Sequence, residues 1–149
     1  MGREKTYPAV VELPHMFTKP YELVKLQDYP DNRGNLFEIL RFKDQGVPGE
    51  GQIYCFTILP GVRRGDHYHT VKREWASCVA GSTYVLVEDK EGNKEKILLK
   101  ADEPSVIYFH PYTAHAFLNE GDTVGVVVSY SSKQLDKENP DTFPKRVEI

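Results

Sequence analysis

Three potential metal ligands lie close together near the middle of the chain: His67, His69 and Glu74. Residues two apart on a β-strand project to the same face, so His67 and His69 should point the same way. Glu74 follows after a short connection, and an adjoining strand would return it to that face. Two imidazoles and a carboxylate are suitable ligands for Zn, Fe, Mn or Ni. The spacing therefore predicts a divalent metal site, and the alternative is that the histidines bind an organic substrate directly.

A fourth candidate ligand lies in the segment HPYTAHAFLN, which covers residues 110–119. Its second histidine, His115, precedes the last long strand-like run of the chain, at 123–130. A β-barrel can bring that run against the strand of His67, because strands far apart in the sequence pair in such folds. His115 would then complete the site of the three ligands above, and the site would keep room for water or substrate.

The elements that must position these side chains are β-strands, because helical periodicity is nearly absent from the sequence. Short stretches rich in Val, Ile, Tyr and Phe are separated by turn residues such as Gly, Pro, Asn and Asp. These stretches cover residues 35–42, 52–59, 74–79, 83–88, 94–99, 105–109 and 123–130. Many short strands with no helices between them indicate an all-β sandwich or barrel.

The chain of 149 residues has the length of one ordinary domain. We expect an extended N-terminal arm over residues 1–20, because prolines punctuate this stretch. The barrel should span 21–132, and the polar, proline-containing segment 133–149 should form a surface tail that can include a short turn of helix. An extended arm commonly adds a strand to the sheet of a second copy, so the arrangement predicts a homodimer.

Charge and hydropathy exclude several classes of partner. There are 19 basic and 22 acidic residues, and no basic cluster is longer than Arg63–Arg64, so nucleic acid is not an expected partner. No apolar run approaches the roughly 20 residues that a membrane span needs, and no secretory signal follows the first residue. Cys55 and Cys78 both lie in apolar runs, where two free thiols fit a reducing compartment better than a disulfide does. The expected location is the cytoplasm.

The histidine-rich segment resembles the first motif of the cupin superfamily. Its sequence is GVRRGDHYHTVKREWASCVAG, and the five fixed positions of the motif are filled by Gly61, His67, His69, Glu74 and Gly81. The segment around His115 resembles the second motif, with Asn119 at the expected offset. It departs from the family at His110 and Tyr112, where a Pro and a Gly are usual. The resemblance implies a single-domain jelly-roll β-barrel.

Shorter segments resemble enzymes that act on nucleotide-linked sugars. Residues 31–38 (DNRGNLFE) resemble the opening strand of dTDP-4-dehydrorhamnose 3,5-epimerases, and residues 64–69 (RGDHYH) are similar to stretches of those enzymes and of dTDP-4-keto-6-deoxyglucose 3,4-ketoisomerases. Residues 139–143 (NPDTF) are similar to the end of the cupin domain in bifunctional enzymes that epimerise and reduce UDP-4-keto-6-deoxy sugars. The resemblance implies a nucleotide-sugar epimerase or ketoisomerase of polysaccharide or deoxysugar biosynthesis. Any reduction is expected to need a separate protein.

The last of these groups binds zinc in its cupin domain. The resemblance carries that metal onto four side chains of this sequence, namely His67, His69, Glu74 and His115. Zinc is therefore the expected cofactor, and no organic cofactor is expected.

Epimerisation or ketoisomerisation removes a proton from the carbon beside a ketone, which requires a base with a pKa near neutral. His67 and His69 are the candidate bases, and Tyr54 and Tyr130 are the candidate acids. A histidine that gives its lone pair to a metal cannot act as a base through the same nitrogen. His67 therefore has two alternative roles, ligand or base, and the base could instead be His110 or a metal-bound hydroxide. The alternative for Tyr54 is a place in the hydrophobic core.

The negative charge that develops on the ketone oxygen, and any diphosphate, need positive partners. Arg64 is the main candidate, because guanidinium groups pair well with phosphate oxygens. Arg33 and His110 are further candidates for contacts with substrate, although Arg33 beside Gly34 could simply serve a tight turn.

Two other functions fit the same residues. A metal-dependent cupin dioxygenase would use the same four ligands to hold Fe, Mn or Ni, and a non-catalytic cupin would bind a sugar or an anion. Residues 31–38 and 139–143 favour the nucleotide-sugar enzyme, and the metal found in the purified protein would separate these alternatives.

Overall fold

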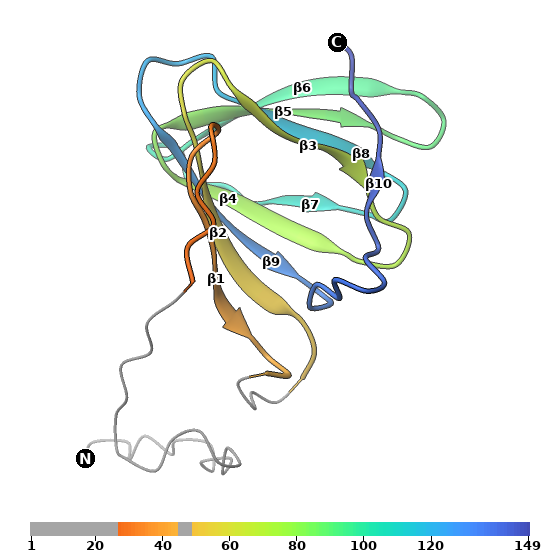
Figure 1. Cartoon of the computed structure of the whole chain (residues 1–149). Helices are drawn as coiled ribbons and strands as arrows, with labels where there is room; N and C mark the ends of the chain where they lie inside the picture. The colour runs from red at the N-terminus through yellow and green to blue at the C-terminus, as the bar shows by residue number, and fades with distance from the viewer. Residues whose placement is uncertain (1–26, 45–48) are drawn as a thin grey trace, which may run out of the picture.

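The computed structural model describes residues 27–44 and 49–149 (Figure 1). The N-terminal arm expected over residues 1–20 lies outside the described residues, so the arm and the homodimer built on it stay predictions. The described residues form strands and no helix. The strands are β1 (Leu36–Arg41), β2 (Gln52–Ile58), β3 (Arg63–Tyr68), β4 (Glu74–Ala80), β5 (Ser82–Glu88), β6 (Lys94–Lys100), β7 (Ile107–Phe109), β8 (Ala114–Leu118), β9 (Gly125–Ser131) and β10 (Phe143–Pro144).

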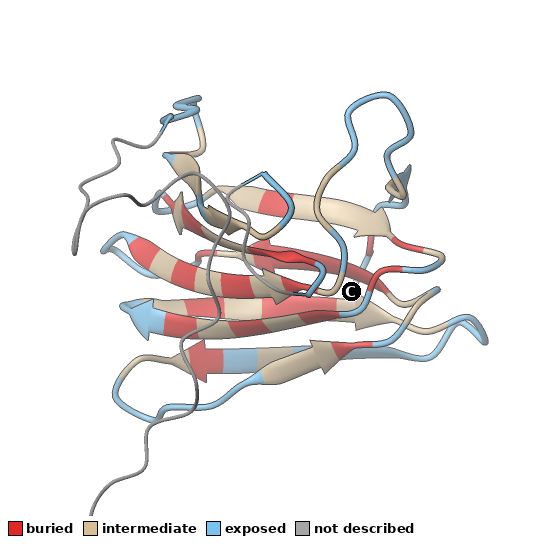
Figure 2. Ribbon diagram, turned by 90° about the horizontal axis from the view of Figure 1, so that it is seen from below, coloured by how far each residue is buried: buried red, intermediate tan, exposed pale blue. Residues whose placement is uncertain are grey.

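These strands pair antiparallel in two five-stranded sheets that face each other (Figure 1). The first sheet has the order β1-β2-β9-β4-β7, and the second has the order β10-β3-β8-β5-β6. The main hydrophobic core lies between them and includes Ile58, Val85 and Val127, all 0% exposed. Buried positions alternate along β9, as the two-residue repeat of a strand requires (Figure 2). The all-β prediction is confirmed.

All seven predicted strands are present, with ends that differ by one or two residues, but three further strands escaped prediction. The sequence of β3 is RRGDHY, which carries charges and a glycine in place of the apolar residues that mark most strands. The short strand β8 contains His115 and pairs with β3. The expectation that the last long strand lies against the strand of His67 is wrong, because β9 pairs with β2 and β4 in the other sheet.

The segment 133–149 is more than the surface tail that the sequence predicts. Most of its side chains are exposed, but β10 pairs with β3 and Val147 is 0% exposed. The Val147 amide donates a hydrogen bond to the Asp66 carboxylate at 3.0 Å, and Arg63 donates to the Val147 carbonyl at 3.0 Å. Val147 packs into a second, smaller apolar cluster on the outer face of the second sheet. The segment is therefore docked, because its buried valine covers apolar surface that the barrel would otherwise expose.

The two cysteines are buried free thiols, Cys55 in β2 and Cys78 in β4. Burial raises the pKa of both thiols, which keeps them protonated and unreactive. Among the described residues, none lies in a helix with the length and apolarity needed to cross a bilayer. The cytoplasmic location stays a prediction.

Asn119 ties the loop before β3 to the loop before β9. Its side chain is 1% exposed, donates hydrogen bonds to the carbonyls of Ile58 and Thr123, both at 2.8 Å, and accepts one from the Gly121 amide at 2.9 Å. We expect Asn119→Ala to lower the free energy of unfolding by about 3 kcal/mol, because the substitution leaves these backbone groups without partners. Urea denaturation followed by circular dichroism measures the loss.

Asn93→Ala is the matched control, because Asn93 is exposed and its side chain contacts only the Asp89 carboxylate of its own turn. It should change the free energy of unfolding by about 0.5 kcal/mol or less. Equal losses in the two variants would contradict the role given to Asn119.

Candidate metal centre

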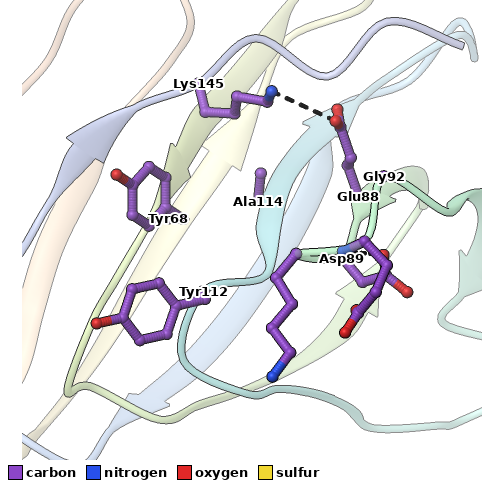
Figure 3. Close-up of a pocket in the computed structure, with 9 residues that line it drawn as sticks. Tyr68, Glu88, Asp89, Gly92, Tyr112, Ala114 and Lys145 are labelled. Carbon is purple, nitrogen blue, oxygen red and sulfur yellow. Dashed lines mark hydrogen bonds and ion pairs between the residues drawn. The ribbon is translucent and has the colours of Figure 1, made fainter.

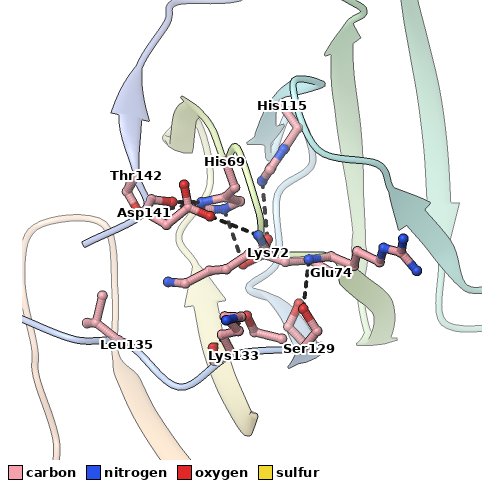
Figure 4. A network of polar contacts seen from close by, with 12 residues as sticks. His69, Lys72, Glu74, His115, Ser129, Lys133, Leu135, Asp141 and Thr142 are labelled. Atoms are coloured by element: carbon pink, nitrogen blue, oxygen red, sulfur yellow. Dashed lines mark hydrogen bonds and ion pairs between the residues drawn. The ribbon is translucent and has the colours of Figure 1, made fainter. Parts of the chain in front are cut away.

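The structure brings His67, His69, Glu74 and His115 together inside the barrel. One ligand atom from each lies within 4.8 Å of the others. His67 comes from β3, His69 follows the end of that strand, and His115 comes from β8, the neighbouring strand of the second sheet. Glu74 begins β4 in the first sheet, so its carboxylate approaches from the facing sheet and not from an adjoining strand, as the sequence had suggested. Figure 4 shows His69, Glu74 and His115 converging.

An irregularity in β3 places the histidines. The register between β3 and β8 shifts between Gly65 and His67, and Asp66 adopts a φ of 58°. Gly65 has a φ of +92°, and a side chain there would meet the His115 carbonyl oxygen at 2.9 Å. The bulge sets His67 directly opposite His115. An extra residue in one strand re-aims the side chains that follow it, which is how a polar strand can turn its imidazoles inward.

Backbone contacts fix the orientation of two imidazole rings. His69 Nδ1 donates a hydrogen bond to the Asp141 carbonyl at 2.5 Å, and His115 Nδ1 donates to the Thr113 carbonyl at 3.1 Å. Because Nδ1 carries the proton in each ring, the Nε2 lone pairs face Glu74, at 3.2 Å from Oε1 for His69 and 3.4 Å from Oε2 for His115. The contact of His69 Nε2 with Glu74 is not aligned as a hydrogen bond, and this buried nitrogen has no hydrogen-bond partner.

Lone pairs that face a carboxylate repel it unless a cation lies between them, and that cation can be a proton on an imidazole or a metal ion. Burial opposes ionisation of Glu74, yet the contacts with His115 and His69 outweigh burial and hold its pKa below the usual range. Burial also opposes protonation of His69, but Glu74 outweighs it and raises the His69 pKa. Burial, with His115 and His69 nearby, lowers the pKa of His67 to about 3. An ionised carboxylate surrounded by imidazole nitrogens attracts a positive charge, and the buried His69 Nε2 without a hydrogen-bond partner fits a metal ligand.

A cavity of about 200 Å³ opens onto this cluster. The residues that line it and could meet a substrate are Arg33, Tyr54, Arg64, His67, Glu74 and His115. Arg64 is 6% exposed, donates a hydrogen bond from Nε to the Thr57 carbonyl at 2.9 Å, and lies 3.6 Å from the Asp31 carboxylate. Arg33 pairs with the same carboxylate. Two guanidinium groups that share one carboxylate leave this wall of the cavity with a net positive charge.

The two candidate tyrosines occupy different places. Tyr54 lines the cavity, with its hydroxyl 3.4 Å from Glu74 Oε1, and burial raises its pKa well above the usual range, so the hydroxyl stays protonated. Tyr130 lies on the outward face of β9, where its hydroxyl donates to the Glu50 carbonyl at 3.2 Å and its ring packs against Trp75. The structure therefore separates Tyr130 from the cluster, because the inward positions of β9 near it belong to serines.

His110 also lies away from the cluster, against expectation. It is exposed in the turn after β7, its ring is 4.5 Å from that of Tyr108, and it does not line the cavity. The turn carries the histidine outward before the chain enters β8, so His110 lacks a place at the site as either a base or a substrate contact.

Asp141 supports the site in a way that sequence reasoning missed. Its carboxylate accepts hydrogen bonds from the amides of Thr70, Val71 and Lys72, each at 2.8 Å, and from the Thr70 hydroxyl at 2.6 Å. Figure 4 shows Asp141 beside Lys72 and His69. Burial opposes ionisation of Asp141, but these donors outweigh it and hold its pKa below the usual range. The residue thus clamps the loop between His69 and Glu74 while its carbonyl orients His69. Aspartate often accepts hydrogen bonds from backbone amides in turns, and Asp141 follows a proline, which is also typical of turns. These residue types were the signal in the sequence that could have indicated this role.

Comparisons with known proteins agree on the family and on the fold. The family described as "Polysaccharide biosynthesis C-terminal domain" matches residues 29–143. UDP-2-acetamido-2,6-beta-L-arabino-hexul-4-ose reductase of Pseudomonas aeruginosa (strain PA103) is 30% identical over 116 residues, which are 77% of this chain and 30% of that protein. Spore coat polysaccharide biosynthesis protein SpsL of Bacillus subtilis is 24% identical over 123 residues, 78% of this chain and 82% of that protein.

Solved structures show the same architecture. Capsular polysaccharide assembling protein CapF of Staphylococcus aureus superposes with a TM-score of 0.76 at 24% identity, over 84% of this chain and 33% of that one. Oxalate decarboxylase of B. subtilis superposes with a TM-score of 0.67 at 17% identity, over 80% of this chain and 30% of that one. The predicted cupin fold is therefore confirmed. The chain spans about a third of the length of the reductase and of CapF.

Proposed function

Because the chain belongs to the polysaccharide biosynthesis C-terminal domain family, we propose that it is a nucleotide-sugar epimerase or ketoisomerase. It transfers a proton at the carbon beside the ketone of a dTDP- or UDP-linked 4-keto-6-deoxy sugar. The observation that carries the proposal is that one cavity is lined by His67, Glu74 and His115 on one side and by Arg33 and Arg64 on another. A cluster suited to a cation, in which His67 serves either as a ligand or as the base, thus shares a space with positively charged groups suited to phosphate.

The four clustered side chains are the proposed metal ligands, and zinc is the proposed metal. Nitrogen and carboxylate donors suit zinc, and His69 Nε2, buried with no hydrogen-bond partner, provides a free lone pair for it. A divalent metal bound there would supply a positive charge to stabilise the oxygen of the enolate.

The other residues of the cavity bind and orient the sugar nucleotide. Arg64 is held by the Thr57 carbonyl, so its guanidinium is preorganised to receive a phosphate oxygen, and Arg33 adds a second positive group beside it. Tyr54 keeps its proton at neutral pH, which makes it the proposed acid that returns a proton to the sugar carbon. Its contact with Glu74 holds the hydroxyl at the edge of the cluster.

We expect the protein to exchange the hydrogen beside the ketone when it is incubated in deuterated water with a dTDP- or UDP-linked 4-keto-6-deoxy sugar. Deuterium incorporation, followed by NMR and mass spectrometry, reports this step even when the product is unstable. His67→Ala should slow the exchange by about 10²–10⁴-fold, because either a ligand or the base is lost. His67 lines the cavity, so its ring can meet a substrate that binds there.

Tyr130→Phe is the matched control, because it removes a hydroxyl that lies outside the cavity, and it should leave the exchange rate unchanged. The proposal fails if no nucleotide sugar of this kind shows exchange while the protein binds iron and consumes oxygen with another substrate.

A further inference from the structure

Three aromatic rings form a row on the outer face of the second sheet, which we call the aromatic platform: Tyr68, Tyr112 and Phe143. The Tyr68 and Phe143 rings lie 5.3 Å apart at an interplanar angle of 23°, and the Tyr68 and Tyr112 rings lie 6.3 Å apart at 26°. Tyr112 is 54% exposed and Phe143 is 41% exposed. Tyr68 follows His67 in β3, and successive side chains of a strand point to opposite faces. The aromatic platform therefore lies outside the barrel, behind the metal centre.

Tyr68 and Tyr112 of the aromatic platform form one wall of an open groove of about 500 Å³, a size typical of small-molecule sites, and Phe143 stacks on Tyr68 beside it. The opposite wall is the turn between β5 and β6, with Glu88, Asp89 and Glu91 (Figure 3). Ala114 lies between the walls, and its small side chain does not fill the groove. Figure 3 shows the two tyrosine rings on one side and Glu88 and Asp89 on the other.

The backbone at Tyr112 indicates that its ring has a use. Tyr112 has a φ of 66°, a left-handed conformation that bulky residues rarely adopt. Its amide donates a hydrogen bond to the His69 carbonyl at 2.6 Å, so the turn is well held. A glycine would fit this conformation without strain, whereas a tyrosine adopts it at a cost. A strained and exposed tyrosine points to a ligand for its ring.

The charges of the groove indicate what kind of ligand fits. Three carboxylates and two lysines line it, and Glu88 and Lys145 pair at 3.3 Å (Figure 3). The Asp89 carboxylate accepts hydrogen bonds from the amides of Glu91 and Asn93. The groove is thus nearly neutral with a slight negative excess, which disfavours a diphosphate. An aromatic wall suits the apolar C–H face of a sugar ring, and a wall of carboxylates suits its hydroxyl groups.

We propose that Tyr68 and Tyr112 of the aromatic platform, together with the β5–β6 turn, bind a neutral sugar ring of a glycan chain. This site is separate from the cavity that receives the sugar nucleotide, and it does not depend on the metal centre. The membership of the chain in a polysaccharide biosynthesis family is consistent with a glycan as the ligand.

The test is an NMR titration of the full-length, ¹⁵N-labelled protein with cellotriose, maltotriose and tri-N-acetylchitotriose. At least one of these sugars, at about 10 mM, should shift the amide signals of residues 68, 88–92, 112, 114 and 145. Tyr112→Gly should weaken that binding by about tenfold or more, because it removes a stacking ring. Since glycine adopts a φ of 66° readily, this variant should stay folded. A measurement of its melting temperature checks this expectation.

Tyr29→Ala is the matched control, because it removes an exposed tyrosine that does not line the groove, and it should bind the sugar as the wild type does. Three results would overturn the proposal: no shifts in the groove with any of the sugars, equal binding by Tyr112→Gly, or groove shifts that depend only on protein concentration. The last result would assign the groove to a second copy of the chain. None of these results bears on proton exchange, so the proposed function stands or fails separately.

Discussion

Glu74→Ala is expected to lose the bound metal and the proton exchange together. The carboxylate is the only acidic member of the cluster and faces the Nε2 atoms of His69 and His115 at 3.2 and 3.4 Å. Without it, the remaining imidazoles hold a divalent ion with less charge and one ligand fewer. The exchange rate should fall by about 10²–10⁴-fold. Metal content measured by mass spectrometry of purified protein, beside the exchange rate, checks both effects.

Two variants make this result specific. Glu74→Gln keeps the size of the side chain but removes its charge, so it should also lose metal, whereas Glu120→Ala removes an exposed carboxylate paired with Lys96 and should lose nothing. If Glu74→Ala loses the metal but keeps most of the exchange, the metal role is wrong. His67 would then act as a free base, as the sequence alternative allowed.

The second large effect is expected at Asp141, which never touches the cavity. Asp141→Ala should lower the free energy of unfolding by about 3 kcal/mol, because three amides and a hydroxyl lose their shared acceptor. It should also weaken metal binding by about 10–100-fold, because the loop between His69 and Glu74 loses its clamp. Chemical denaturation and competition with a zinc chelator measure the two quantities.

Asp136→Ala is the control, because that carboxylate caps two exposed amides of its own turn and lies on the same segment. It should leave metal affinity unchanged. Asp141→Asn keeps one acceptor oxygen and should fall between the wild type and the alanine variant. Equal metal affinity in Asp141→Ala and the wild type would show that the clamp stabilises the fold without positioning His69.

The strands that the sequence predicted are those whose pattern of apolar residues matches the face that is buried in the fold. Strands such as β2 and β9 carry apolar residues on the face that packs inside, so their existence followed from composition alone. The strand β3 was missed because its side chains at the cavity, Arg64 and His67, are polar and its bulge interrupts the two-residue repeat. The grouping of His67, His69 and Glu74 was nevertheless predicted, since residue type and spacing within one segment do not depend on which strands pair.

The sequence could not reveal what long-range pairing decides. The sequence predicts a site role for Tyr130, but the structure places this residue on the outward face of β9. Which side chains of β9 point inward depends on its register with β2 and β4, and the sequence does not show that register. The role of Asp141 was hidden for a similar reason: its partners lie about 70 residues earlier in the chain. His110 sits five residues before His115, yet a single turn is enough to point it outward.

The clamp by Asp141 has a consequence for the order of events during synthesis. Translation releases the N-terminal part of a domain first, at about 5–20 residues per second, so the three histidines and Glu74 leave the ribosome before Asp141 does. A nascent chain that ends before this residue can pair most of its strands, but His69 has no carbonyl to orient it and the loop after it is unclamped. Tight metal binding at the proposed centre would thereby be delayed until the segment that carries Asp141 has docked. The proposed ion would enter after that step, and incomplete chains would compete poorly for it.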